Sequence, residues 1–136
     1  MPRWLLPVAA LLALAAPLRA EIAHVDAAAL QKLIRGGVPV VDVRTAAEWD
    51  KTGIVEGSHL LTFFDAEGRY DVRAWMAKFA AIAAPGQPVA LICHSGRRSK
   101  SVSRLLDRHF QYRRVYNVEG GIAKWMKEGR PTVARD

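Results

Sequence analysis

The stretch Val89-Ala90-Leu91-Ile92-Cys93-His94-Ser95-Gly96-Arg97-Arg98-Ser99 decides the fold. Its first five residues form a continuous apolar run, which is typical of a parallel strand buried on both faces. A short polar loop follows, and Ser99 is predicted to open a helix with apolar residues at helical spacing: Val102, Leu105, Leu106 and Phe110. Open α/β sheets place their ligand sites at the carboxyl ends of such strands. The stretch therefore predicts an α/β fold with a site at Cys93.

The rest of the chain repeats this alternation of short apolar runs and helical segments. Residues 22–25 and 38–43 are predicted strands, and residues 51–69 are predicted to be loop and short strand. Three helix starts carry side chains that suit an N-cap: Asp26, Thr45 with Glu48 three residues later, and Asp71. We expect one domain, residues 21–136, built on a central, mostly parallel sheet of about five short strands with helices on both faces.

Residues 1–20 have the pattern of a secretory signal peptide. Arg3 precedes an apolar run of 15 residues, 4–18, and Arg19-Ala20 come before the first acidic residue, Glu21. The run is shorter than the roughly 20 residues that a membrane-spanning helix needs. We therefore expect cleavage after Ala20 rather than retention as an anchor. The expected mature chain is periplasmic or secreted in a bacterium, and it is not bound to the membrane.

Composition and charge exclude several classes of protein. Apolar residues make up 51% of the chain and charged residues 24%, so disorder and fibrous structure are excluded. Without Arg3 and Arg19 the 20 basic residues become 18, against 13 acidic ones, and the net charge falls from +7 to +5. Lys100, Arg104 and Arg108 form a basic stripe at four-residue spacing. We expect this stripe to be a solvated helix face that attracts small anions rather than a nucleic-acid interface, and the expected export also disfavours nucleic acid.

Cys93 is the single cysteine of the 136-residue chain, which excludes an intramolecular disulfide and any multi-cysteine metal site. A lone cysteine at a strand end is most often a small buried residue without chemistry. Here, amides of the loop and of the next helical turn are expected to point at the sulfur, and two arginines add positive charge. This arrangement favours thiolate over thiol and also binds small oxyanions. We therefore favour a nucleophilic Cys93 that acts on an anionic substrate.

Residues 93–99, with the pattern C-x-x-G-x-R-S, resemble the active-site loop of the single-domain rhodanese-like sulfurtransferases. Two other stretches agree with this resemblance. Residues 41–49 contain the Asp-x-Arg strand end of that family at Asp42 and Arg44, and residues 120–131 resemble its closing helix. The resemblance extends over residues 22–131. It fails at residues 52–58, where the family's Gly-His-Ile-Pro-Gly-Ala is absent, so that histidine is not carried over.

The resemblance implies a thiosulfate sulfurtransferase. The Cys93 thiolate takes the outer sulfur of a small anionic donor, thiosulfate or a persulfide, and holds it as a cysteine persulfide. Cyanide, a thiol or a protein sulfur acceptor then removes that sulfur, and no metal or organic cofactor is implied. The alternative is a noncatalytic module of the same fold that carries sulfur or binds a partner protein. A phosphatase or arsenate reductase is disfavoured, because its clamping arginine stands six positions after the cysteine, where this chain has Ser99.

The predicted substrate site consists of loop residues: His94, Ser95, Gly96, Arg97, Arg98 and Ser99. We expect Arg98 to anchor the substrate and Arg97 to attract the anionic donor from the rim. Ser99 either donates its hydroxyl to the sulfur or only caps the helix. Gly96 provides either an unusual backbone conformation or room for substrate. His94 either tunes donor choice or is only a polar loop residue.

Asp42 and Arg44 are supporting candidates at the end of a neighbouring strand. We favour a structural hydrogen-bonding role for them, because a carboxylate close to the thiolate opposes its ionisation. Phe63 and Phe64 are assigned to the core rather than to a pocket wall. The core also receives three tryptophans: Trp49, Trp75 and Trp125.

Overall fold

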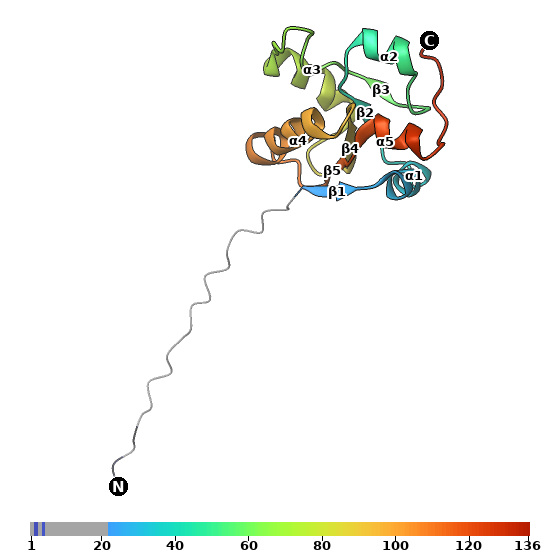
Figure 1. The fold of residues 1–136 in the computed structure, drawn as a ribbon. Coiled ribbons are helices and arrows are strands. Elements are labelled where there is room, and N and C mark those ends of the chain that lie inside the picture. Colours follow the sequence, from blue (N-terminus) through green and yellow to red (C-terminus); the bar gives the residue numbers. More distant parts are fainter. Residues whose placement is uncertain (1, 3, 5–21) are drawn as a thin grey trace.

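The computed structural model describes residues 2, 4 and 22–136. Apart from two positions, the predicted signal peptide of residues 1–20 lies outside the described residues. Strands and helices alternate in the described range (Figure 1): β1 (Ala23–Val25), α1 (Ala27–Arg35), β2 (Val40–Asp42), α2 (Ala46–Thr52), β3 (His59–Leu60), α3 (Val72–Ile82), β4 (Val89–Ile92), α4 (Arg97–Phe110), β5 (Val115–Val118) and α5 (Gly121–Lys127). Within that range, no helix has the length and apolar character that crossing a membrane requires.

The five strands form one sheet in the order β1-β5-β4-β2-β3, and every neighbouring pair is parallel. β4 is the central strand, with Leu91 in register with Asn117 of β5 on one side and Val41 of β2 on the other. The predicted α/β fold with a parallel sheet of about five short strands is confirmed.

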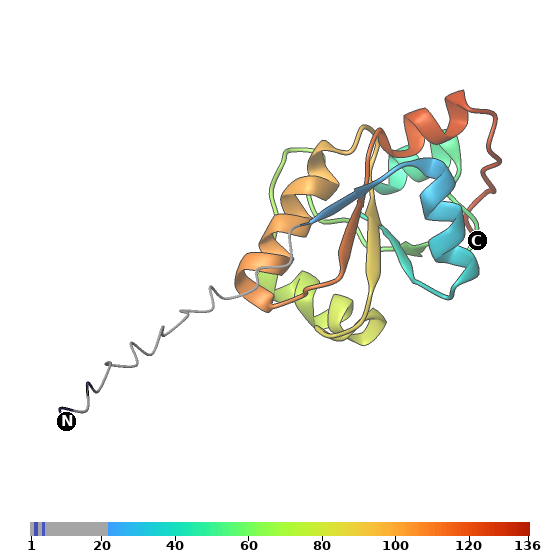
Figure 2. The same ribbon diagram turned by 90° about the horizontal axis from the view of Figure 1, so that it is seen from below.

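Helices cover both faces of the sheet (Figure 2). Val89 and Leu91 of β4 belong to an apolar cluster with buried residues of α3 and α4: Trp75, Phe79, Val102 and Leu106. Ala90 and Ile92 belong to a second cluster with buried residues of α1 and α5: Leu30, Ile122 and Trp125. Successive residues of β4 therefore alternate between two cores, which explains why its sequence is apolar throughout.

Local capping signals set the starts of three helices. The carboxylate of Asp26 accepts a hydrogen bond from the Ala29 amide (2.8 Å), and that of Asp71 accepts one from the Ala74 amide (3.0 Å). Thr45 forms a capping box with Glu48 at the start of α2. All three predicted caps are confirmed.

The predicted start of α4 was wrong. The helix begins at Arg97 rather than at Ser99, and its N-cap is Gly96, which provides no side-chain hydrogen bond. Gly96 has a φ of +95°, a left-handed conformation that favours glycine and ends the loop without a polar cap. The prediction rested on Ser99 as a capping side chain, whereas a backbone turn at Gly96 starts the helix without one.

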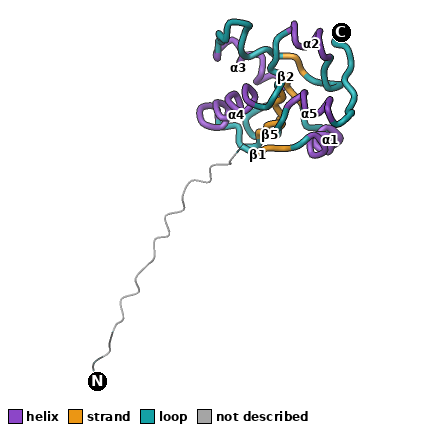
Figure 3. The backbone as a smooth tube through the Cα atoms, in the orientation of Figure 1, coloured by secondary structure: helices purple, strands orange, loops and turns teal. Residues whose placement is uncertain are grey.

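The three tryptophans assigned to the core, Trp49, Trp75 and Trp125, are buried. Phe63 is also buried and packs edge-on against Trp75, with ring centroids 5.1 Å apart. Phe64 is partly buried against the same apolar cluster and also lines a pocket, so it has both of the roles considered for it. Both phenylalanines lie in the segment between β3 and α3. Figure 3 shows the loops and turns of the chain in teal.

Candidate active site

Cys93 follows the last residue of the central strand β4 and is buried beneath the loop that leads to α4. Its sulfur accepts hydrogen bonds from the backbone amides of Gly96 (3.1 Å) and Ser99 (3.4 Å). The Ser99 hydroxyl lies 3.2 Å from the same sulfur. The amides therefore point at Sγ as the sequence predicts, and they provide partial positive charge for a thiolate.

The loop carbonyls are held by the first turn of α5. The amide of Ile122 donates to the carbonyl of Cys93 (2.9 Å), and the amide of Ala123 donates to the carbonyl of His94 (3.1 Å). Gly121 has a φ of +56°, and a Cβ at this position would collide with both of these carbonyl oxygens. This close packing fixes the two peptide groups that follow Cys93.

Gly96 is confined in a similar way. A Cβ at Gly96 would lie 3.1 Å from the amide nitrogen of Gly120 and 3.2 Å from the carbonyl oxygen of Val118. The positive φ and the limited space both favour glycine. The space is taken by the turn between β5 and α5, so Gly96 lets the loop approach that turn closely.

Ser99 also contacts a buried amide on β5 that the sequence reading missed. Its Oγ lies 2.6 Å from Oδ1 of Asn117, whereas Nδ2 of Asn117 donates to the carbonyl of Gly96 (3.3 Å) and lies 3.2 Å from Nδ1 of His24. The available signal was a lone polar residue within an otherwise apolar strand, Val115–Val118. Ser99 does not cap α4, which starts two residues earlier.

Arg98 is paired with Glu48 of α2. Its Nη1 and Nη2 donate to Oε1 (2.8 Å) and Oε2 (2.7 Å) of that carboxylate. This hydrogen bonding lowers the pKa of Glu48 to about 2, although partial burial acts in the opposite direction. The same hydrogen bonding raises the pKa of Arg98, against the lowering effect of its partial burial. The predicted anchoring arginine is thus already engaged by a carboxylate that the sequence reading did not connect to it.

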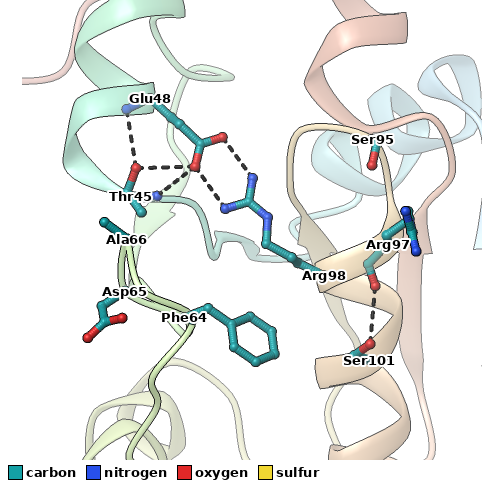
Figure 4. A pocket seen from close by; sticks show the side chains of 10 residues that line it. Thr45, Glu48, Phe64, Asp65, Ala66, Ser95, Arg97, Arg98 and Ser101 are labelled. Atoms are coloured by element: carbon teal, nitrogen blue, oxygen red, sulfur yellow. Dashed lines mark hydrogen bonds and ion pairs between the residues drawn. The ribbon is translucent and has the colours of Figure 1, made fainter.

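A pocket of about 750 Å³ lies beside the loop that follows Cys93 (Figure 4). Its walls are the N-terminal ends of α2 and α4 and the segment after β3. The Arg98–Glu48 pair crosses it, and the ring of Phe64 faces the first turn of α4. Arg97 extends away from Arg98, is exposed, and forms no ion pair within the described part of the chain. Ser95 lies at the edge of the pocket, while His94 is exposed and does not line it.

Residues 26–128 match the Rhodanese-like domain family. The chain belongs to this family. A search among curated proteins found no match. A solved rhodanese-related protein from Thermoplasma volcanium is 26% identical, with a TM-score of 0.63 over 83% of this chain and 99% of that chain.

Two other similar structures show the fold alone, because their sequence identity is lower. The polysulfide-sulfur transferase homodimer from Wolinella succinogenes is 23% identical, with a TM-score of 0.64 over 87% of this chain and 82% of that chain. A possible tyrosine phosphatase from Rhodopseudomonas palustris is 21% identical, with a TM-score of 0.60 over 82% of this chain and 85% of that one.

In this rhodanese-like domain, Asp42 and Arg44 form a fully buried ion pair at the end of β2. Nε and Nη2 of Arg44 donate to the Asp42 carboxylate at 2.8–3.1 Å. The remaining guanidinium donors reach the Thr52 hydroxyl (2.8 Å) and the Gly53 carbonyl (3.0 Å). These contacts join the end of β2 to the end of α2, and neither side chain lines the pocket. In the part of the chain that the structure describes, no cluster of three or more His, Cys, Asp or Glu side chains is arranged to hold a metal ion.

Proposed function

We propose that this rhodanese-like domain is a sulfurtransferase that moves a sulfane sulfur from thiosulfate or a persulfide donor to cyanide or a thiol. One observation carries the proposal: two backbone amides and a hydroxyl converge on Sγ of Cys93 at the end of the central strand. Donors fixed in this way stabilise negative charge on a sulfur without having to reorganise during the reaction.

The first step loads the cysteine. The Cys93 thiolate attacks the outer sulfur of thiosulfate, the S–S bond of the donor breaks, and sulfite leaves with the bonding electron pair. The product is a cysteine persulfide whose outer sulfur carries the negative charge. The Gly96 and Ser99 amides are positioned to hold the thiolate before this step. Covalent catalysis of this kind divides one difficult transfer into two easier ones.

The second step unloads the cysteine. Cyanide or a thiolate attacks the outer sulfur, the Sγ–S bond breaks, and the electron pair returns to Sγ of Cys93. With cyanide the product is thiocyanate, and with a thiol it is a new persulfide. Both steps balance without a metal, an organic cofactor or an external oxidant, so the chain needs only the donor and the acceptor.

The pocket beside the loop supports a small anionic donor. Arg97 is an exposed guanidinium at its rim, and the basic stripe of α4 continues away from it with Lys100, Arg104 and Arg108. Such a surface increases the local concentration of anions. The pocket volume of about 750 Å³ also leaves room for an acceptor larger than cyanide, which supports a thiol or a protein cysteine as acceptor.

Phosphoryl or arsenyl chemistry is less well supported. A phosphatase clamps its oxyanion with two donors of a free arginine guanidinium. In this chain Glu48 already binds both terminal nitrogens of Arg98, and the next residue is Ser99, whose hydroxyl is directed at Sγ and Asn117. A noncatalytic sulfur carrier shares the loading step and differs only in lacking turnover, so measured turnover separates it from the enzyme.

We also propose that the protein is exported. The short apolar run in residues 4–18, followed by Arg19-Ala20, supports a cleaved signal. The test is N-terminal sequencing of the protein recovered from the periplasm or medium of a bacterium that expresses the full chain. A start at Glu21 supports the proposal, whereas recovery of the uncleaved chain in the membrane fraction contradicts it.

Turnover is tested by following thiocyanate formation from thiosulfate and cyanide with residues 21–136. We expect saturable formation by the wild-type chain and none above buffer with Cys93→Ser or Cys93→Ala. If the wild-type chain accepts sulfur but turns over with no acceptor, including small thiols, the sulfur-carrier alternative replaces the enzyme.

A further inference from the structure

A line of polar contacts connects the surface of the sheet edge to the buried sulfur. His24 of β1 and Asn117 of β5 are register partners, and their side chains meet with Nδ1 and Nδ2 3.2 Å apart. Oδ1 of Asn117 lies 2.6 Å from Oγ of Ser99, which in turn lies 3.2 Å from Sγ of Cys93. His24 is exposed, whereas the other three residues are buried.

The orientation of the Asn117 amide is fixed by its neighbours. Nδ2 donates to the carbonyl of Gly96 (3.3 Å), so Oδ1 is the atom that faces Ser99. An amide oxygen can only accept, and the Ser99 hydroxyl has one hydrogen to donate. That hydrogen has two possible acceptors, Oδ1 of Asn117 and Sγ of Cys93, and it cannot serve both.

The charge on the sulfur determines which acceptor prevails. An uncharged Sγ is a weak acceptor, so the hydrogen remains on Asn117 across the short 2.6 Å contact. A thiolate is charged, and hydrogen bonds to charged groups are stronger than those between neutral groups. Rotation of the Ser99 hydroxyl then transfers the hydrogen bond to Sγ, with no covalent bond made or broken.

We propose that Asn117 is a positioning residue that holds the Ser99 hydroxyl hydrogen while Sγ is uncharged and releases it to Sγ when the sulfur becomes a thiolate. Asn117 does not touch Sγ and acts through Ser99. Nδ1 of His24, when it carries no proton, can accept from Nδ2 of Asn117 across 3.2 Å, which supports the amide in this orientation.

The consequence for turnover rests on the proposed sulfur transfer. In the persulfide the negative charge lies on the outer sulfur, so Sγ is neutral and Ser99 remains directed at Asn117. When an acceptor removes the outer sulfur, charge develops on Sγ as the leaving group. The Ser99 hydroxyl then rotates and stabilises that charge as it appears, but it gives up its bond to Asn117, so Asn117 limits how strongly the departing thiolate is stabilised.

The test measures ionisation of the thiol rather than turnover, so it remains informative if sulfur transfer is disproved. Cys93 is the only cysteine, and the ultraviolet absorbance of its thiolate can be followed against pH with Cys93→Ser as the blank. Four chains are compared: wild type, Asn117→Ala, Ser99→Ala and the double variant. The charged and titratable groups around the loop and Asn117 are common to all four chains: Arg97, Arg98 and Lys100 of α4, His94 of the loop, Glu48 of α2, the Asp42–Arg44 pair, His24 of β1 and Glu119 after β5.

We expect Asn117→Ala to lower the midpoint of thiolate formation by about one pH unit, because the freed Ser99 hydroxyl donates to Sγ permanently. In the Ser99→Ala background the same Asn117 change should have no effect. An equal shift in both backgrounds, or no shift in either, overturns the proposal. Leucine has a volume similar to that of asparagine and no hydrogen-bond acceptor, so Asn117→Leu replaces Asn117→Ala if the alanine variant does not fold. A lowered midpoint only when Ser99 is present again supports the proposal, and an equal shift in both backgrounds or no shift in either overturns it.

Discussion

Arg98 and Glu48 are 50 residues apart in the sequence, and each terminal nitrogen of the arginine donates to a different oxygen of the carboxylate. Glu48 is also the N3 residue of the capping box of α2, where it accepts a hydrogen bond from the Thr45 amide (3.3 Å). One carboxylate therefore completes the start of α2 and holds the first turn of α4 beside the loop that follows Cys93. This pairing places a neutralised arginine, rather than a free one, next to Cys93.

Replacing Glu48 is expected to change stability in a pH-dependent way. The pKa of Glu48 is about 2 in the folded chain, below its ordinary value of 4.5, chiefly because of the hydrogen bonds from Arg98. The stabilisation that the ionised Glu48 adds to the folded state is therefore fully present above about pH 4.5, and it is lost as the pH falls through 2. Because the pair is partly exposed, we expect Glu48→Gln to cost about 1 kcal/mol of unfolding free energy near neutral pH.

Urea denaturation of wild type and Glu48→Gln at several pH values measures this difference. Glutamine keeps an acceptor oxygen for the Thr45 amide, so the helix cap survives. Glu56→Gln is the matched control, because Glu56 is exposed and has no ion pair among the described residues. A Glu48→Gln cost that does not shrink on acidification contradicts the assigned pairing.

The two loop arginines are expected to differ in their effect on an anionic donor. Arg98→Ala removes a positive charge and also uncovers Glu48 in the pocket, whereas Arg97→Ala removes only a rim charge. We expect the KM for thiosulfate to rise about tenfold for Arg98→Ala and about threefold for Arg97→Ala. Steady-state thiocyanate assays at low and high salt measure both effects.

A rescue variant separates the causes of the Arg98 effect. If uncovering Glu48 raises the KM, adding Glu48→Gln to Arg98→Ala should restore much of the loss. An Arg97 effect equal to or larger than the Arg98 effect contradicts this division of roles.

Gly121 is expected to be the most sensitive glycine near the site. A Cβ there would collide with the carbonyl oxygens of Cys93 and His94, in addition to the strain of the left-handed backbone. We expect Gly121→Ala to lower the unfolding free energy by at least about 3 kcal/mol. Gly37→Ala is the control, because Gly37 has a φ of +83° with open space around it and should cost only about 1–2 kcal/mol. Equal losses in denaturation experiments would show that the loop carbonyls can move aside.

The fold was largely predictable because its signals are local. Asp26, Thr45 and Asp71 each mark a helix start within three residues, and the apolar run before Cys93 is long enough to identify a buried strand. The same local reasoning misplaced the start of α4, because the left-handed turn at Gly96 replaces a capping side chain. A glycine in the sequence indicates that such a turn is possible, but it does not identify the residue at which the helix begins.

The site was only partly predictable because its contacts are distant in sequence. Cys93 and the residues of its loop could be found together, since they follow one strand. The partner of Arg98 is 50 residues away, and the His24–Asn117 contact spans 93 residues. Such pairs depend on strand order and register, which place β5 beside β1, and β4 beside β2.

The most direct test of the central claim is the intact mass of residues 21–136 after incubation with thiosulfate and removal of excess donor. The account predicts a mass increase of one sulfur atom in the wild-type chain, loss of that increase on addition of cyanide, and no increase in Cys93→Ser. An unchanged wild-type mass with thiosulfate and with organic persulfide donors would contradict sulfur transfer through Cys93.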